Sequence, residues 1–237
     1  MFAPVGSPIY NTVNAFPFTP GNIGDFIVLE VVCESSVVSC TGLTSGSVTW
    51  RTLVPATLSN GNYCTVFIGV VTSTAADTGN LTFTGTQPVI NFTGMEFSTT
   101  AGYGAVSLDS FGVMPATSTN AFPALTPHTV NELYFGYAYC LGFASAGSTP
   151  GFTYSVDVSS NGACWNAACA NATQTPVWAN TSGWGGLAVM LYEASVPGGS
   201  VGGISGGGPA TVQGSWHVIS PAVQTVNQGT AYIGSGG

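Results

Sequence analysis

Six cysteines are the side chains of this 237-residue sequence that could most readily form covalent bonds or bind a metal ion. Zinc sites usually space their thiolates as Cys-x-x-Cys, a spacing that is absent here. The pairs closest in sequence are Cys33 with Cys40 and Cys164 with Cys169, which makes local disulfides one interpretation. The alternative is reduced, buried thiols, because three of the six lie in apolar runs. The positions are Cys33, Cys40, Cys64, Cys140, Cys164 and Cys169.

Acid–base chemistry would need titratable groups placed together. Neither His128 nor His217 lies near an acid in a recognisable motif. Glu96 and Glu193 are expected to occupy equivalent positions on the closing strands of two similar segments, and paired carboxylates can cleave glycosidic bonds. We favour the simpler interpretation that acids at strand ends accept hydrogen bonds from backbone donors. The sequence therefore predicts no catalytic residue, no metal ion and no cofactor.

Three closely spaced tryptophans are the remaining candidates for ligand binding. Trp165, Trp178 and Trp184 stand in loop-like contexts beside Asn and Gln. Indole rings combined with amide side chains suit a sugar or glycolipid ligand. The alternative, which we favour, is that these rings pack in the core or at a subunit interface.

The composition excludes several classes of function. One basic residue, Arg51, stands against nine acidic ones, and charged residues form 4% of the chain, where about 25% is usual. A nucleic-acid partner or a polybasic membrane contact needs several Lys or Arg. At 45% hydrophobic residues, the chain can still bury a core. An uncharged surface suits packing against copies of itself or other subunits.

The elements that would position these residues are predicted to be β-strands. Short runs rich in Val, Ile, Phe, Tyr and Thr are bounded by Gly, Asn, Ser and Pro, which is typical of a sandwich or barrel. Two runs, FIVLEVVC and LAVMLYEA, are almost continuously apolar and indicate strands covered on both faces. Strands are predicted at 25–33, 47–54, 62–71, 80–85, 88–98, 131–140, 152–158, 176–179 and 185–194.

The chain repeats one pattern. Residues 19–33 and 126–140 both begin Thr-Pro, place an acid before an apolar run, and end in cysteine. Halves of this size would be marginal alone, so we predict one all-β, jelly-roll-like antiparallel β-sandwich built from two repeated halves. Asp25 and Glu132 then mark the start of equivalent strands. Cys33 and Cys140 could be neighbours, which leaves a third cysteine pairing open.

The domain prediction follows from these patterns. Residues 1–23 are expected to form an N-terminal arm, 24–195 the β-sandwich, 196–209 a Gly-rich linker, and 210–237 a C-terminal docking tail. The irregular stretch 99–125 is expected to be a long loop between the halves. The N-terminus lacks a positive region and an unbroken apolar stretch, so we expect no secretory signal.

The order of these segments resembles a known family. Gly24-Asp25, VTWRTL at 48–53, the run 63–86, TVNELYFGYAY at 129–139 and WGGLAVMLYEAS at 184–195 are similar to the β-sandwich modules of actinobacterial phage minor tail proteins. The resemblance covers roughly 19–195. It implies a jelly-roll-like sandwich in the virion, at the tail tip or on fibres.

We therefore expect a non-enzymatic structural protein of a bacteriophage, a minor tail or fibre component assembled in the host cytoplasm. Its expected partners are copies of itself, other virion proteins, and a cell-wall glycan or glycolipid of the host envelope. A capsid decoration protein is the alternative within this class. The alternative from another class is a carbohydrate-binding surface module or envelope depolymerase.

Overall fold

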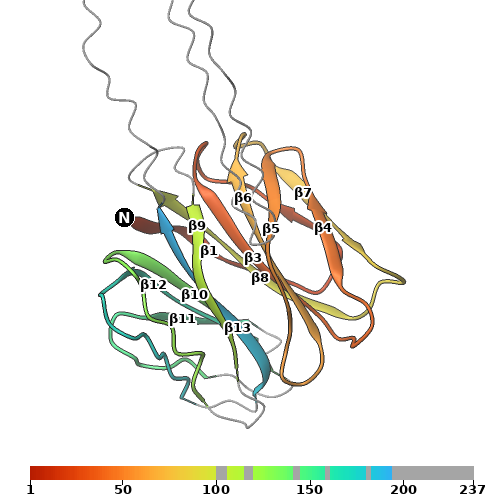
Figure 1. Ribbon diagram of the computed structural model, residues 1–237. Coiled ribbons are helices and arrows are strands. Elements are labelled where there is room, and N and C mark those ends of the chain that lie inside the picture. Colours follow the sequence, from red (N-terminus) through yellow and green to blue (C-terminus); the bar gives the residue numbers. More distant parts are fainter. Residues whose placement is uncertain (100–105, 115–119, 141–144, 158–160, 180–182, 194–237) are drawn as a thin grey trace, which may run out of the picture. The chain divides into compact units, whose positions relative to one another are not determined.

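The computed structural model describes residues 1–99, 106–114, 120–140, 145–157, 161–179 and 183–193 (Figure 1). All regular elements in these residues are antiparallel β-strands, which confirms the predicted all-β sandwich. The strands are β1 (Phe2–Asn11), β2 (Ala15–Phe18), β3 (Phe26–Cys33), β4 (Cys40–Thr44), β5 (Val48–Thr57), β6 (Tyr63–Val71), β7 (Asp77–Phe83), β8 (Ile90–Thr99), β9 (Val106–Val113), β10 (Glu132–Cys140), β11 (Thr153–Val156), β12 (Gly162–Cys169) and β13 (Gly183–Glu193).

Each half of the chain forms its own five-stranded sheet. The first sheet has the order β1-β8-β3-β6-β5, and the second sheet has the order β9-β13-β10-β12-β11. The two orders match strand by strand, with β3 equivalent to β10 in the central position. The small sheet, β2-β7-β4, has no counterpart in the second half. The predicted duplication is thus a duplication of sheet topology.

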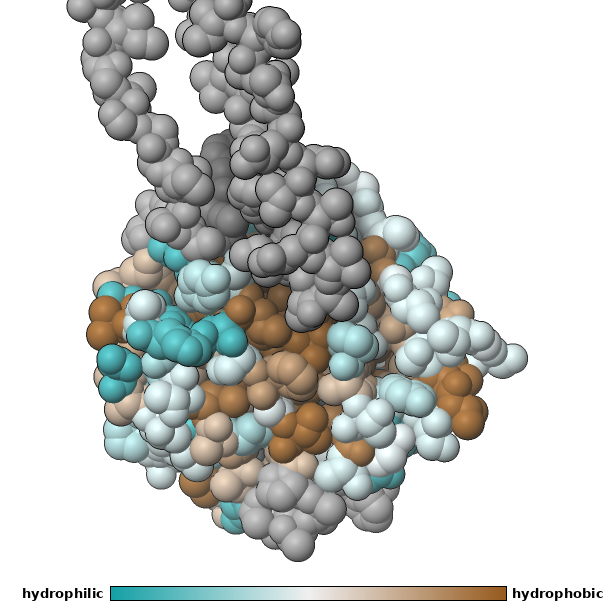
Figure 2. All heavy atoms as spheres, in the orientation of Figure 1, coloured by the Kyte–Doolittle hydropathy of each residue, from teal (hydrophilic) through white to brown (hydrophobic). Residues whose placement is uncertain are grey.

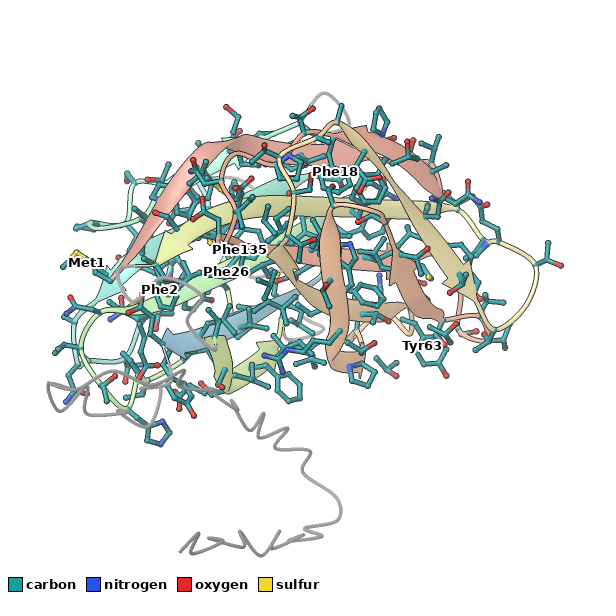
Figure 3. All side chains as sticks on the ribbon, turned by 90° about the horizontal axis from the view of Figure 1, so that it is seen from above. Met1, Phe2, Phe18, Phe26, Tyr63 and Phe135 are labelled. Atoms are coloured by element: carbon teal, nitrogen blue, oxygen red, sulfur yellow. The ribbon has the colours of Figure 1, made fainter. Side chains whose placement is uncertain are left out.

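The main core lies between the two large sheets. Phe97 of β8 packs edge-on against Phe135 of β10, with ring centroids 6.0 Å apart, and Figure 3 shows Phe26 and Phe135 pointing into this layer. On the other face of the first sheet, Phe16 of the small sheet packs against Phe92, 4.5 Å away. All eight residues of β3 are buried as a result, as its continuous apolar run predicts.

Loops cover the outer face of the second sheet. Two isolated bridges, Ala121 with Val177 and Leu125 with Gln174, hold these loops together. Phe122 and Trp178, together with Leu125, are buried against side chains of β10, β12 and β13. Both large sheets are therefore covered on both faces, one by strands and the other by loops.

Several segments differ from the sequence prediction. Residues 1–23 are not only an arm: β1 pairs with β8, and β2 pairs with β7. The expected loop 99–125 contains β9, and 176–179 forms only a single bridge instead of a strand. The predicted linker and docking tail, 196–237, lie outside the described residues. Within the described part of the chain, no helix could cross a membrane.

Candidate functional site

The two central strands begin in the same local conformation. Gly24 precedes β3 and Asn131 precedes β10, each two residues before the first apolar side chain of the strand. Both have a left-handed backbone conformation, with φ 92° for Gly24 and φ 66° for Asn131. Glycine and asparagine tolerate this conformation best. The backbone N–H of Gly24 donates to Val71, at the end of β6, and that of Asn131 donates to Cys169, at the end of β12, each at 2.9 Å. The two halves thus share this individual backbone hydrogen bond as well as their sheet order.

The acids that follow these residues act on their own turns. Asp25 accepts a hydrogen bond from the amide nitrogen of Asn22 at 3.0 Å. Glu132 accepts one from the backbone N–H of Thr129 at 2.7 Å and another from its hydroxyl at 3.1 Å. In both cases the donor lies three residues upstream. The prediction that Asp25 and Glu132 mark strand starts is confirmed.

Glu96 of β8 closes the turn that precedes β3. Its carboxylate accepts hydrogen bonds from the backbone N–H of Gly21, at 2.8 Å and 3.0 Å, and of Asn22, at 3.2 Å. Burial raises the pKa of Glu96, these hydrogen bonds oppose the rise, and the neighbouring charge of Asp25 adds to it. Glu96 and Asp25 resemble a catalytic carboxylate pair in composition, but Glu96 binds main-chain donors and Asp25 binds the side-chain amide of Asn22, so both stabilise the turn.

Glu96 and Glu193 do not occupy equivalent positions, and this expectation is wrong. Glu96 lies opposite Ile27 of β3, whereas the residue of β13 opposite Tyr134, the counterpart of Ile27, is Met190. Glu193 lies three residues further on and binds the N-terminal amine of Met1 at 2.9 Å. Aligning the two segments by their sequence similarity therefore places Glu193 three residues away from the position that is equivalent to Glu96 in the sheet.

A histidine–carboxylate contact was not foreseen. The Nδ1 atom of His128 contacts the carboxylate of Asp109 in β9, and the side chain of Asp109 is only 6% exposed while that of His128 is 78% exposed. Burial raises the pKa of the adjacent Glu132, hydrogen bonds from Thr129 oppose the rise, and the charge of Asp109 adds to it. Asp109 can orient the imidazole as a base. No described cluster of His, Cys, Asp or Glu could hold a metal ion.

Glu30 is the second unforeseen group, because it lies inside the apolar run of β3. It shares the inward face with Phe26 and Val28 and is 0% exposed. Neither carboxyl oxygen has a hydrogen-bond partner of ordinary geometry among the described residues. Burial raises the pKa of Glu30 well above its ordinary value, and the backbone of Tyr137 on the facing sheet offsets only part of the rise. Burial therefore favours the neutral form of the Glu30 carboxyl inside the sandwich.

Of the two interpretations of the tryptophans, packing holds for the two whose side chains are described. Trp165 is a residue of β12, 7% exposed in the core between the large sheets. Trp178 is 1% exposed, lies 5.0 Å from the ring of Tyr154, and covers Gly162, where a Cβ atom would come within 2.3 Å of the indole. Protein atoms cover both rings, so they pack instead of presenting a face to a sugar. Trp184 belongs to β13, but its side chain lies outside the described residues.

The five described cysteines are free, buried thiols. The local pairs Cys33–Cys40 and Cys164–Cys169 are therefore not formed in this structure, and the alternative of buried thiols holds for these residues. Burial raises the pKa of Cys33 to about 11 and that of Cys40 to about 12, so both are protonated at neutral pH. The side chain of Cys140 lies outside the described residues.

A shallow hollow of about 740 Å³ lies on the small sheet, lined by residues that include Thr44, Asp77 and Asn80. Burial opposes the ionisation of Asp77, but hydrogen bonds from Ser47 and Thr78 outweigh it and hold its pKa at about 2. The carboxylate is therefore ionised at neutral pH. Both of its oxygens are already held by Ser47 and Thr78, so the hydroxyl and amide groups of the hollow are the ones that can hydrogen-bond a polar, uncharged ligand.

The charged side chains of the chain are committed to internal contacts. All nine acidic residues lie in the described part. Eight of them accept a hydrogen bond or an ion pair from other described groups, and the ninth, Glu30, is buried. The guanidinium of Arg51, the one basic side chain, donates to the backbone carbonyl of Val106 at 2.5 Å.

The resulting surface is poor in free charge. On the face shown in Figure 2, pale residues of intermediate hydropathy and brown hydrophobic residues outnumber strongly hydrophilic ones. No protein-family model, curated protein or solved structure matches this chain.

Proposed function

We propose that this protein is a structural component of a bacteriophage particle, a minor tail or fibre protein that assembles with copies of itself and with other virion proteins. The observation that carries the proposal is that eight of the nine acids and Arg51 have partners within the chain, while the ninth acid, Glu30, is buried. Free surface charge keeps a protein soluble and separate. A module whose charged side chains contact groups of its own chain has little free surface charge, which suits permanent packing against neighbours.

The sequence resemblance to minor tail modules supports the same proposal. So do the two carboxylate sites, because Glu96 and Glu132 bind backbone donors and shape turns. A catalytic carboxylate would be directed at a substrate. The functional use of these acids is thus architectural.

Labelling of intact particles tests the proposal. Gold-conjugated antibody against this chain should decorate the tail or its fibres in negative-stain images. Decoration of the head would favour the capsid alternative, and particles that lack the chain in both labelling and mass spectrometry would contradict a virion role.

Contact with the host envelope has one favoured surface, the hollow beside Asp77. Its hydroxyl and amide groups can hydrogen-bond a neutral glycan, while the negative charge of Asp77 disfavours an anionic one. Binding of the purified chain to isolated host cell walls should fall for Asn80→Ala, whose side chain is exposed on β7, and remain for Asn60→Ala, an exposed amide outside the hollow. Equal binding of both variants would remove the hollow from consideration.

A further inference from the structure

The carboxyl group of Asp109 is directed toward the turn before β10 by a local irregularity in β9. The register between β9 and β13 shifts at this residue, between Leu108 and Ser110. Such a bulge leaves one residue unpaired and changes the direction of its side chain. The side chain of Asp109 is consequently only 6% exposed, although it belongs to an edge strand.

The bulge brings this carboxylate into a cluster with His128 and Glu132. Oδ1 of Asp109 contacts Nδ1 of His128, and its charge also acts on the carboxyl group of Glu132. Glu132 is 2% exposed. Its Oε1 accepts hydrogen bonds from Thr129, whereas its Oε2 is buried and has no partner of ordinary geometry among the described residues. Two shielded carboxyl groups therefore lie beside one exposed imidazole.

Neighbouring elements supply no positive charge to this cluster in the part of the chain that the structure describes. Cys169 of β12 lies opposite Glu132, and burial raises the pKa of its thiol to about 11. The titratable residues of β13 are Tyr192, which has a phenol, and Glu193, which binds the N-terminal amine. The guanidinium of Arg51 donates to a backbone carbonyl at the start of β9. The imidazole is therefore the group through which the cluster can acquire a positive charge.

The internal repeat supplies a comparison. The equivalent turn before β3 also holds two carboxyl groups, those of Asp25 and Glu96, and both bind Asn22. The ion pairs among the described residues include no basic group at that turn. The second half thus adds to the same arrangement a side chain whose type ordinarily changes its charge between pH 5 and pH 8.

We propose that His128 is a proton-dependent clamp, whose positive charge keeps Asp109 and Glu132 together and joins the turn before β10 to the edge strand β9. Loss of that charge leaves two shielded carboxyl groups without a neutralising partner. The clamp therefore stabilises the turn while the imidazole is protonated, and its contribution is lost as rising pH removes the proton. This device goes beyond the proposed function and does not depend on it.

Hydrogen exchange at pH 6 and pH 8 tests the proposal on the whole chain, with each rate divided by the intrinsic rate of an unstructured peptide. The amides of 128–132 report the opening of the turn. In the wild type their opening constant should rise about three- to fivefold from pH 6 to pH 8, the size expected for an ion pair with one exposed partner.

Two variants should change this response in opposite directions. His128→Gln keeps a neutral hydrogen-bond donor but removes the charge, so its turn should open at pH 6 as readily as that of the wild type at pH 8. Glu132→Gln keeps an oxygen for Thr129 but removes one carboxylate. It should open less than the wild type at pH 8, and it should make the effect of His128→Gln smaller in the double variant. Exchange of 21–25, in the equivalent turn, is the control and should not respond to His128→Gln.

Three results would overturn the proposal. Equal opening of the wild-type turn at pH 6 and pH 8 would show that the imidazole proton does not control it. An equal effect of His128→Gln at both pH values would leave His128 with hydrogen bonding and packing alone. An effect of His128→Gln that is as large with Glu132→Gln as without it would separate the two residues. The location of the chain in labelled particles is unaffected by any of these results, so a failure here leaves the proposed function standing.

Discussion

The two halves of the sandwich share a sheet order and the turn that begins the central strand. They carry different side chains, however, at equivalent positions of the central strands. Glu30 of β3 corresponds to Tyr137 of β10, and both are buried between the large sheets. The first half is covered on its outer face by an additional small sheet, and the second by loops around Trp178. Topology and turn geometry are thus common to both halves, while coverings and buried polar groups differ.

This comparison shows which parts of a repeat are constrained. Gly24 and Asn131 share a left-handed conformation and an equivalent backbone hydrogen bond, because each directs the following central strand into the core. The coverings need only bury apolar surface, which strands and loops both achieve. The edges can differ most, since β1 and β9 each pair with a single strand among the described residues.

The largest effect is expected where the loop covering is removed. Trp178→Ala should lower the free energy of unfolding by about 3–5 kcal/mol, because it leaves a cavity over Gly162. Phe16→Ala should cost a similar amount by opening the small sheet's contact with Phe92. Urea titration measures both, with Val177→Ala, at an exposed neighbouring position, as control. A loss below about 1 kcal/mol for Trp178→Ala would show that the loops are not a structural equivalent of the small sheet.

Glu30→Gln tests the difference between the facing central strands. The folded-state pKa of Glu30 lies above its ordinary value of 4.5, so as pH rises past 4.5 the unfolded chain loses this proton while the folded chain keeps it. The wild type therefore loses stability with rising pH, by about 1.4 kcal/mol per pH unit until the folded pKa is reached. Glu30→Gln should lack this slope.

Unfolding free energies from pH 4 to 8 measure the effect as the difference between variant and wild type. Glu34→Gln is the matched control, because Glu34 follows the same strand but is exposed. Parallel pH profiles for wild type and Glu30→Gln would mean that Glu30 is ionised in the folded protein.

The two glutamates of the closing strands should respond unequally. Glu96→Gln turns an amide toward the N–H donors of Gly21 and Asn22 and should cost about 1.5–3 kcal/mol. Glu193→Gln removes the ion pair with the exposed terminus of Met1, so we expect a loss below about 1 kcal/mol. Thermal unfolding at constant pH compares them, and equal losses would restore the idea of equivalent acids.

The smallest effects concern the left-handed turn residues. Gly24→Ala forces a side chain into a left-handed conformation and should cost about 1–2 kcal/mol. Asn131→Gly should change stability by only a few tenths of a kcal/mol, because both residue types accept this conformation. Chemical denaturation resolves the difference. A large loss for Asn131→Gly would assign its side chain a role that its counterpart lacks.

The sequence was most informative where packing and pattern agree. The continuous apolar run of β3 correctly indicated a strand buried on both faces, and the repeated acid before each central strand correctly marked a turn. β12 was missed because its residues are mostly small, GACWNAAC, and β-propensity undervalues small residues that make room for a neighbour such as Trp178. Sheet order cannot be deduced from local pattern.

The candidate site was less predictable for a similar reason. Asp109 and His128 are 19 residues apart in sequence, and their contact depends on β9, a strand whose polar residues concealed it. The burial of Glu30 could have been predicted from the sequence, because it is the single acid in an eight-residue apolar strand. Its environment could only be assigned once the facing sheet was known.

The pairing of β1 with β8 has a consequence for biosynthesis. Phe2 lies opposite Thr99, so the first sheet cannot close until about the first hundred residues have left the ribosome. Its inward face, with Phe26 and Phe97, must then wait for the second sheet, which ends at Glu193. During that interval the nascent half exposes a broad apolar surface, which makes it vulnerable to aggregation. Expression at lowered temperature, or with chaperones that hold nascent chains, should therefore improve the yield of folded protein.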